Sequence, residues 1–482
     1  MGKASSRRFA SGLVLLSQQQ CKSAAIEFQQ MLAANPNSIE SRILLGLAYD
    51  CAGDRPNLTA TLNRIWNYDL DPQEPTAEMA LIENAFNSGM QLQPQTARGM
   101  YFESLLNLRL GRYDAALTQL RSVTSPVVDS WAYYNLLGTI YLRQSRFTES
   151  RSALETASAR NPNQADTFYK MGTVLLATGD GAGATAKFRQ AVKLRPAFPA
   201  AHAALGIALL QGKQFAAARA ALLKGTSVGP EIYIYLGAAD EGLGDTKSAI
   251  ADYRTALVKQ PQSPSAELSL GRLLLTTNDL SGATEHLEKA LKLDPQNPAG
   301  NLYLATVYVA TNRKEDAGAL AARAKALSTN EGAEFQDALG NVFQNLDRQS
   351  DAQDSFKRAV TLAPDKEDYV RHLAAAQKKS GDNTGTVTTL RSGIDHLPSS
   401  ARLEYLLGLT LMSQGSIADA LEPFQKATTL EPQNAEYRQS LGVCLAELQK
   451  DDEAMAAFQQ TLLLDPTHTQ AYLQIGILQL KT

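Results

Sequence analysis

Glycine and proline recur along this chain with a common period, and that period constrains the fold more than any other feature of the sequence. A first series of small residues advances mostly in steps of about 34 residues, and its members are Gly138, Gly172, Gly206, Gly237, Gly271, Ala305, Gly340, Ala374, Gly408, Gly442 and Gly476. A second series follows the first at a nearly constant offset, and its members are Pro162, Pro196, Pro230, Pro261, Pro295, Pro364, Pro398, Pro432 and Pro466. Two interlocked series that share one period indicate a tandem repeat.

The residues between one glycine and the next proline predict how each repeat folds. In the repeat that contains Gly172, Ala184 and Phe188 lie four residues apart, and an alanine three residues further on completes one face of a helix. A polar turn at 178–180 separates this helix from the one before it. Pro196 then ends it, because proline lacks an N–H and clashes with the preceding turn. We therefore expect each repeat to be a pair of antiparallel helices that approach closely through small residues.

This period, the glycine near the front, the alanine in the middle and the proline at the end together resemble the tetratricopeptide repeat. We count thirteen such repeats, which begin near Ser5, Ile39, Ala97, Trp131, Ala165, Pro199, Pro230, Pro264, Pro298, Ala333, Glu367, Ala401 and Ala435, before a final half-repeat that begins near Thr469. The resemblance implies an all-α fold, a right-handed α-solenoid superhelix of antiparallel helix pairs. It also implies that the first helix of each repeat lines a concave face.

One interval, from Gly46 in the second repeat to Ser104 in the third, is longer than one period. The extra segment, 73–96, contains a helical stretch over 76–87 that is bounded by Pro75, Gly89 and Pro94. It reads as a degenerate repeat that has lost one helix; the alternative is an inserted helix that kinks the array or docks a partner. The expected divisions are two repeats in 1–72, the segment 73–96, about eleven repeats in 97–468 and a terminal helix in 469–482.

Aromatic and apolar residues occupy many of the positions that the resemblance assigns to the concave face. They are Tyr101, Phe102, Leu105, Tyr169, Ile207, Tyr235, Leu268 and Tyr303. Tyrosine offers a large contact area and a hydroxyl, which suits an extended peptide. The alternative is that several of these side chains pack against neighbouring repeats.

Two groups of basic residues fall on the same face. The first consists of Arg98, Arg109, Arg143 and Lys170, with Asn135 among them, and the second of Arg371, His372, Lys378, Lys379 and Arg402. Either group could bind a carboxylate or an acidic peptide through charge-assisted hydrogen bonds, or could be solvated surface charge. The members of the family that clamp a terminal carboxylate use paired asparagines. Here Asn341 is followed by His372, so we do not expect that clamp.

Composition narrows the classes of function. A formal net charge of −3 argues against general affinity for nucleic acids, which requires an excess of Lys and Arg. No apolar run approaches the roughly 20 residues that span a bilayer. Cys21, Cys51 and Cys444 form no CxxC pair, so we expect buried free thiols rather than a disulfide framework or a zinc site. The five histidines show no HExxH spacing, and no catalytic motif or cofactor site is found.

The sequence therefore predicts a non-catalytic scaffold that binds peptide or protein ligands along its concave face. The alternatives are the repeat arm of a larger enzyme, such as a glycosyltransferase, and a periplasmic scaffold for polysaccharide export. A cytoplasmic location is expected if Met1 is the native start, and an exported one if a leader has been removed. The helix at 469–481 is apolar around most of its circumference, so we expect part of its surface to be exposed or covered by self-association.

Overall fold

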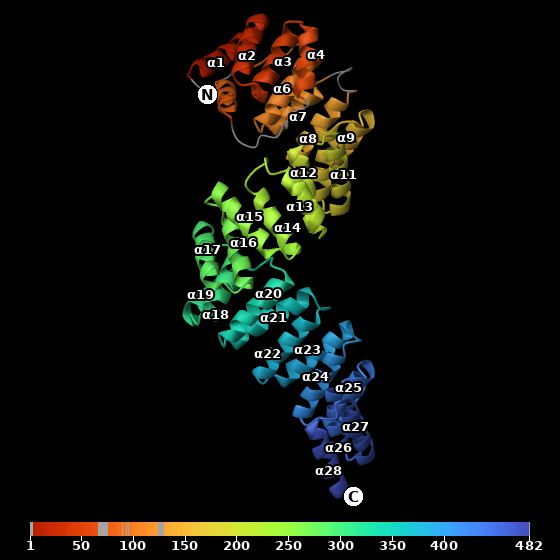
Figure 1. Ribbon diagram of the computed structural model, residues 1–482. Helices are drawn as coiled ribbons and strands as arrows, with labels where there is room; N and C mark the ends of the chain where they lie inside the picture. The colour runs from red at the N-terminus through yellow and green to blue at the C-terminus, as the bar shows by residue number, and fades with distance from the viewer. Residues whose placement is uncertain are drawn as a thin grey trace. The chain divides into compact units, whose positions relative to one another are not determined.

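A computed structural model describes residues 3–65, 76–88, 90–92, 94, 96–123 and 130–481. The chain divides into two compact units, Met1–Lys259 and Gln260–Thr482. Every regular element in the described residues is a helix, and successive helices pack in antiparallel pairs (Figure 1). This confirms the predicted all-α fold of helix pairs.

The first unit contains α1 (Lys3–Ser17), α2 (Cys21–Ala34), α3 (Ile39–Cys51), α4 (Arg55–Ile65), α5 (Ala77–Asn87), α6 (Ala97–Arg109), α7 (Tyr113–Arg121), α8 (Trp131–Arg143), α9 (Phe147–Arg160), α10 (Ala165–Ala177), α11 (Gly181–Leu194), α12 (Pro199–Gln211), α13 (Phe215–Lys224), α14 (Ile232–Gly242) and α15 (Thr246–Lys259). The second unit contains α16 (Pro264–Thr276), α17 (Leu280–Leu293), α18 (Pro298–Ala310), α19 (Lys314–Leu327), α20 (Ala333–Asn345), α21 (Gln349–Leu362), α22 (Glu367–Lys379), α23 (Asn383–His396), α24 (Ala401–Ser413), α25 (Ile417–Leu430), α26 (Ala435–Glu447), α27 (Asp451–Leu464) and α28 (Thr469–Lys481).

The repeated glycine makes room for a large side chain from the second helix of its own pair. At eight of these glycines a Cβ atom would lie 2.5–2.7 Å from the nearest atom of that side chain. The pairs are Gly138 with Leu154, Gly172 with Phe188, Gly206 with Leu222, Gly237 with Tyr253, Gly271 with Leu287, Gly340 with Phe356, Gly408 with Phe424 and Gly442 with Phe458. The large residue follows its glycine at the same separation in every pair, so the period of the sequence is also the period of its packing.

The turn between the two helices of a pair also has a repeated conformation. Among the residues that the structure describes, thirteen turn residues, spaced like the repeats, have a φ between 54° and 85°, and six of them are glycine. The others are Gln19, Ser145, Lys213, Asn278, Asn312, Asp347 and Gln449. In the turn at Gly179, the N–H of Asp180 donates to the carbonyl of Leu175 at 2.9 Å. This is the hydrogen bond of a Schellman motif, which ends a helix at a residue with positive φ. This conformation turns the chain back for the second helix.

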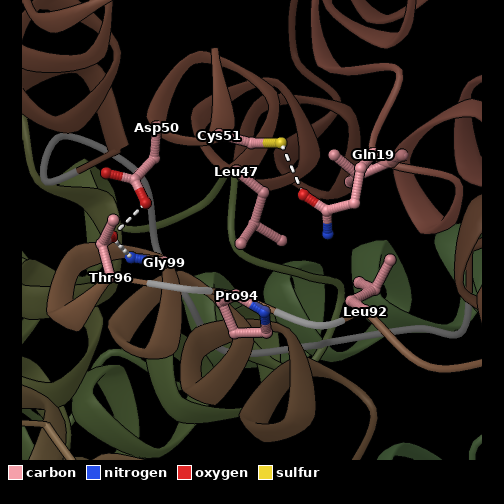
Figure 2. Close-up of a pocket in the computed structure, with 9 residues that line it drawn as sticks. Gln19, Leu47, Asp50, Cys51, Leu92, Pro94, Thr96 and Gly99 are labelled. Carbon is pink, nitrogen blue, oxygen red and sulfur yellow. Dashed lines mark hydrogen bonds between the residues drawn. The ribbon is translucent and has the colours of Figure 1, made fainter. Parts of the chain in front are cut away.

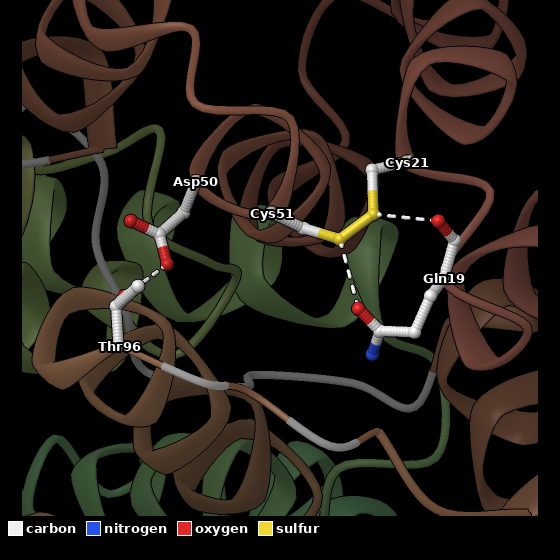
Figure 3. The surroundings of a disulfide bond; sticks show 5 residues. All are labelled: Gln19, Cys21, Asp50, Cys51 and Thr96. Atoms are coloured by element: carbon white, nitrogen blue, oxygen red, sulfur yellow. Dashed lines mark hydrogen bonds between the residues drawn. A yellow bond between two sulfur atoms is a disulfide. The ribbon is translucent and has the colours of Figure 1, made fainter.

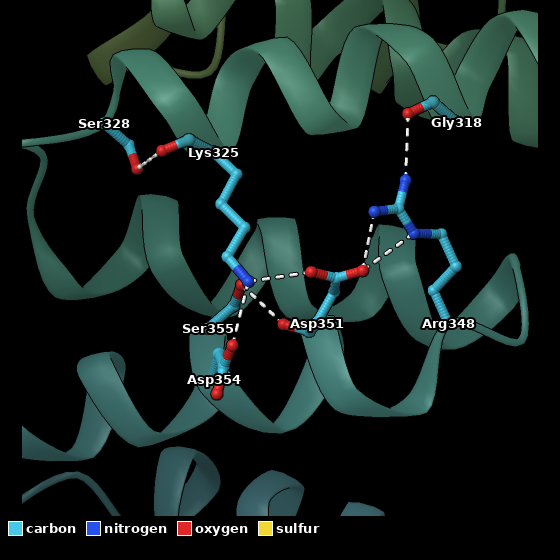
Figure 4. Close-up of polar contacts among 7 residues, drawn as sticks. All are labelled: Gly318, Lys325, Ser328, Arg348, Asp351, Asp354 and Ser355. Carbon is cyan, nitrogen blue, oxygen red and sulfur yellow. Dashed lines mark hydrogen bonds and ion pairs between the residues drawn. The ribbon is translucent and has the colours of Figure 1, made fainter.

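Charged side chains join two second helices near the one place where the series of prolines is interrupted. Lys325 at the end of α19 lies 2.8 Å from a carboxylate oxygen of Asp351 and 2.9 Å from one of Asp354, both on α21 (Figure 4). Arg348 lies 2.6 Å from the other carboxylate oxygen of Asp351 and donates to the carbonyl of Gly318 at 3.2 Å. This network ties α19 to α21 across the irregular loop that follows Leu327.

Helix α5 lies beside the stack of repeats, because α6 packs directly against α3 and α5 packs against α1 and α3. Residues 73–75, which include the expected boundary of the extra segment and Pro75, lie outside the described residues, as does Gly89. The division of the chain at 72, 96 and 468 stays a proposal.

The expectation that all three cysteines are free thiols is wrong. Cys21 at the start of α2 and Cys51 at the end of α3 form a disulfide, with their Cα atoms 5.7 Å apart (Figure 3). They are 30 residues apart and carry no motif, but the antiparallel packing of α2 on α3 brings the start of one helix to the end of the other. Cys444 is free and buried, as expected.

Candidate interaction surface

The first helix of each repeat presents the positions that the sequence analysis assigned to ligand binding. In the first unit α1, α3, α6, α8, α10, α12 and α14 contact one another in succession, and in the second unit α16, α18, α20 and α22 do so, as do α24 and α26. We call the surface formed by positions 2, 5, 6, 9, 12 and 13 of the repeats, counted from the repeat starts given above, the first-helix face. It is described separately for each unit.

The apolar residues predicted on α6 lie in the core. Tyr101, Phe102 and Leu105 are all buried. The Tyr101 hydroxyl donates to the carbonyl of Ala132 on the next first helix at 3.4 Å. Burial raises the pKa of Tyr101 well above its ordinary value, with Asp166 adding to the effect. These three side chains therefore join repeats to one another in this structure.

A buried polar network joins α8 to α10. The Asn135 side chain donates to the Asp166 carboxylate at 3.1 Å and accepts from the Thr167 hydroxyl at 3.1 Å. Lys170 lies one helical turn from Asp166, with its Nζ atom 2.7 Å from the same carboxylate. Asn135 and Lys170, predicted separately as ligand-binding residues, are thus brought together by an aspartate that the sequence analysis did not identify.

The other predicted tyrosines are more accessible. Tyr169 is half-buried and packs against Phe188 and Phe198, with ring centroids 6.0 Å and 5.2 Å apart. Tyr303 is half-buried, and Tyr235 on α14 is 38% exposed. Of the predicted aromatic residues, Tyr235 offers the most surface to a ligand.

The second basic group is interleaved with acids. His372 on α22 lies 2.7 Å from a carboxylate oxygen of Asp337 on α20, and the side chain of Asn341 donates to the other oxygen at 3.1 Å. Asp337 therefore links Asn341 to His372, where clamping members of the family hold a carboxylate ligand. An aspartate there disfavours a carboxylate ligand, because like charges repel in a partly buried site.

The remaining members of this group vary in exposure. Arg371 pairs with Asp368 at 2.5 Å, one turn before it on the same helix. Lys379 is exposed and lies 3.6 Å from Asp347. Lys378 and Arg402 are exposed as well. Lys378, Lys379 and Arg402 are therefore the accessible members of the group.

Buried carboxylates are the ionisable groups that the sequence analysis missed. Arg109 on α6 lies 2.7 Å from Glu40 on α3, and both side chains are at most 5% exposed. Glu103 on α6 accepts from the amide of Gln119 on α7 at 2.6 Å, and burial raises the pKa of Glu103 to about 7. Glutamate and aspartate within largely apolar helices were the available signal, and the sequence analysis did not use it.

A third buried acid lies on α14, the first helix of the repeat that begins near Pro230. Arg219 on α13 lies 2.5 Å from Asp240 on α14, whose side chain is almost fully buried. Burial, with Asp240 nearby, raises the pKa of Asp252 on α15 to about 6. The pair of Arg219 with Asp240 therefore joins α13 to α14.

A small cavity of about 90 Å³ lies between α1, α3 and α6 (Figure 2). The Thr96 hydroxyl, which caps α6, also bonds to the Asp50 carboxylate, and Pro94 and Leu92 close one side. The described residues that line the cavity include one carboxylate and no nucleophile paired with a base. In the residues that the structure describes, no cluster of three or more metal-ligating side chains is found. Nor is any described helix both long and apolar enough to cross a membrane.

Comparison with known proteins agrees with the repeat pattern. Two family profiles, both described as tetratricopeptide repeat, match the chain, one over 275–342 and the other over 103–166, 169–226, 236–298 and 390–468, which is more than half of its length. No curated protein matches the sequence.

Several solved structures are similar. A fragment of MamA from Desulfovibrio magneticus RS-1 is 25% identical and matches 35% of this chain and 96% of its own, with a TM-score of 0.33. The Cut9–Hcn1 hetero-tetramer of APC/C is 14% identical over 96% of this chain and 94% of its own, with a TM-score of 0.37. PilF of Pseudomonas aeruginosa is 19% identical over 43% of this chain and 95% of its own, with a TM-score of 0.38. At TM-scores this low, these likenesses carry no argument about function.

Proposed function

Because the chain belongs to the tetratricopeptide repeat family, whose fold generally mediates protein–protein interactions, we propose that it is a non-catalytic scaffold that binds peptides or protein partners along its first-helix face. The observation that carries this proposal is the exposure of Tyr235 on that face of the first unit. Tyrosine is enriched at the energetic centres of protein interfaces, where a rigid ring and a hydroxyl give contact area at low entropic cost. In the second unit, exposed Lys378 and Arg402 offer donors for polar groups of a ligand.

Affinity capture with the full chain tests the proposal. We expect Tyr235→Ala to reduce the recovery of partners at least tenfold relative to the parent chain. The matched control is Val258→Ala, which removes a more exposed apolar side chain, but from the second helix α15. Equal losses from both variants would contradict binding along the first-helix face.

The repeat arm of a larger enzyme and a periplasmic scaffold for polysaccharide export are the alternative functions. The Cys21–Cys51 disulfide bears on the compartment, because disulfides persist in oxidising compartments and are rare in the cytosol. It favours an exported chain. Counting reactive thiols in protein taken directly from its native cells tests this, since three free thiols would contradict an oxidising location.

We also propose that α28 mediates self-association. Its exposed apolar residues Leu473, Ile477 and Leu480 follow the spacing of one helical face, and Leu480 is 90% exposed. Gly476 lies on the same face and has no atom within 4 Å of where its Cβ would be, whereas the corresponding glycines of other repeats face a large side chain. A helix from a second copy would cover this surface.

A further inference from the structure

Helix α5 lies on the first-helix face of the first two repeats and reaches the turn that follows α6. Leu81 and Ala85 on α5, and Ser88 directly after it, line a cavity together with Leu13 and Ser17, which hold positions 9 and 13 of the first repeat. At its start, α5 places Glu78 close to Glu40, which holds position 2 of α3. At its end, the Arg112 side chain, just after α6, lies 5.2 Å from the Phe86 ring and donates to the side chain of Asn87 at 2.9 Å. The helix therefore extends along the surface that the proposed function assigns to ligands.

The side chains of α5 divide into a buried and an exposed face, as in a bound amphipathic helix. Ile82 is fully buried in the same apolar core as Leu13, Leu47 and Leu105, which hold position 9 of the first three repeats and are buried too. Thr139, at position 9 of the fourth repeat, is also buried, but the same position is half-exposed in α10, α12, α24 and α26. Glu83, Asn84 and Asn87 point the polar face of α5 away from the core. The burial of Leu13 and Leu47 accords with the packing of α5 against α1 and α3.

Two features show that α5 is an imperfect occupant of this surface. A cavity of about 670 Å³ remains between α1 and α5, and Val14 beside it is exposed although it is apolar. Glu78 is buried near Glu40, so its charge is desolvated and repelled; both effects raise its pKa, although Ser38 and Asn35 hydrogen-bond to its carboxylate. A helix with larger apolar side chains in place of Ala85 and Ser88, and a neutral acceptor in place of Glu78, would fit better.

We propose that α5 is an internal ligand of the first-helix face of α1 and α3, and that a protein partner binds there by replacing it with an amphipathic helix. The partner helix carries a hydrogen-bond acceptor in its first turn and an apolar stripe in place of Leu81, Ile82 and Ala85. Access to this part of the face is then set by the competition between α5 and the partner. The inference rests on the proposed function, but its test uses only the sequence of this chain.

The test uses a fluorescently labelled synthetic peptide of residues 76–92, titrated into the full chain and followed by anisotropy. Ile82→Asp in the chain releases α5, because a buried charge without a partner is strongly unfavourable. We expect the peptide to bind this variant at least tenfold more tightly than it binds the parent chain, in which α5 occupies the site. A peptide that itself carries the Ile82→Asp substitution should bind neither chain, and one with Glu78→Gln should bind the variant chain more tightly.

A milder variant separates displacement from unfolding. The Thr76 side chain caps α5 by accepting from the N–H of Met79 at 3.1 Å, so Thr76→Ala weakens α5 without touching the core. We expect Thr76→Ala in the chain to raise the affinity for the peptide about fivefold, the value that corresponds to the loss of a typical cap. Equal affinity for the parent, Thr76→Ala and Ile82→Asp chains would overturn the proposal, as would loss of the helical content of the first unit in Ile82→Asp. Failure of affinity capture with Tyr235→Ala would leave this result unaffected.

Discussion

The ring of Phe356 occupies the space that a side chain at Gly340 would need, because a Cβ on Gly340 would lie 2.6 Å from the Cδ1 and Cε1 atoms of the ring. We expect Phe356→Ala to lower the free energy of unfolding by about 3–5 kcal/mol, the usual cost of removing a buried aromatic side chain. Gly340→Ala should also destabilise, because α20 and α21 must separate to admit the new methyl group. The control is Gly318→Ala on α19, where nothing lies within 4 Å and the better helix former should stabilise by about 0.5–1 kcal/mol. Urea unfolding of the three variants measures these differences.

The pH dependence of stability should report the buried carboxyl of Glu103. Burial raises its pKa from 4.5 to about 7, so the folded chain holds this proton at pH values where the unfolded chain has released it. The stabilisation is complete below pH 4.5 and is lost as the pH rises to about 7. We expect Glu103→Gln, which keeps a partner for Gln119, to flatten the decline of the melting temperature between pH 5 and pH 8. Parallel curves for parent and variant would contradict this reading.

Two tyrosines of the first-helix face should differ in how much their replacement by alanine lowers the free energy of unfolding. Tyr101 is buried, so Tyr101→Ala should lower the free energy of unfolding by about 3 kcal/mol or more. Tyr235 is exposed, so Tyr235→Ala should change it by about 0.5 kcal/mol or less. Thermal unfolding monitored by circular dichroism makes the comparison. A large loss in Tyr235→Ala would mean that this ring holds repeats together instead of contacting a ligand.

Removing only one partner of the buried ion pair between Arg109 and Glu40 should lower the free energy of unfolding strongly. Arg109→Met leaves the Glu40 carboxylate buried beside Glu78, and we expect a loss of about 3–5 kcal/mol. The double variant Arg109→Met with Glu40→Leu should recover most of that loss, because no unpaired charge remains. Arg146→Met, which breaks an exposed pair with Glu149, is the control and should leave stability nearly unchanged. Additive losses in the double variant would show that packing, not charge, matters at this site.

Charged residues on α28 should prevent self-association. We expect the parent chain to form dimers that increase with concentration, and Ile477→Glu with Leu480→Glu to abolish them, because the exposed apolar surface is then charged. Leu463→Glu on α27 alters a similarly exposed apolar residue outside the proposed interface and should leave the dimers intact. Light scattering over a concentration series distinguishes these outcomes. A parent chain that stays monomeric at high micromolar concentration would contradict the proposal.

The sequence predicted the helix pairs well, because their determinants repeat within one period. The glycine, the large residue that follows it at a fixed separation and the proline that ends the second helix act inside one repeat or at its edge. The candidate site was harder to predict from the sequence, because its contacts join residues of different repeats. Arg109 meets Glu40 at a distance of 69 residues, and the register that brings them together depends on how the repeats stack. The disulfide and the burial of Tyr101 also depend on contacts between repeats, and for this reason the sequence did not predict them.

The Cys21–Cys51 disulfide joins the second helix of the first repeat to the first helix of the next. In an array whose units contact only their neighbours, amide protons become exchangeable when a border between two repeats opens. This one border cannot open while the bond is intact. The first two repeats should therefore exchange their amide hydrogens as a single cooperative block, and a reductant should divide that block in two without altering exchange in the second unit.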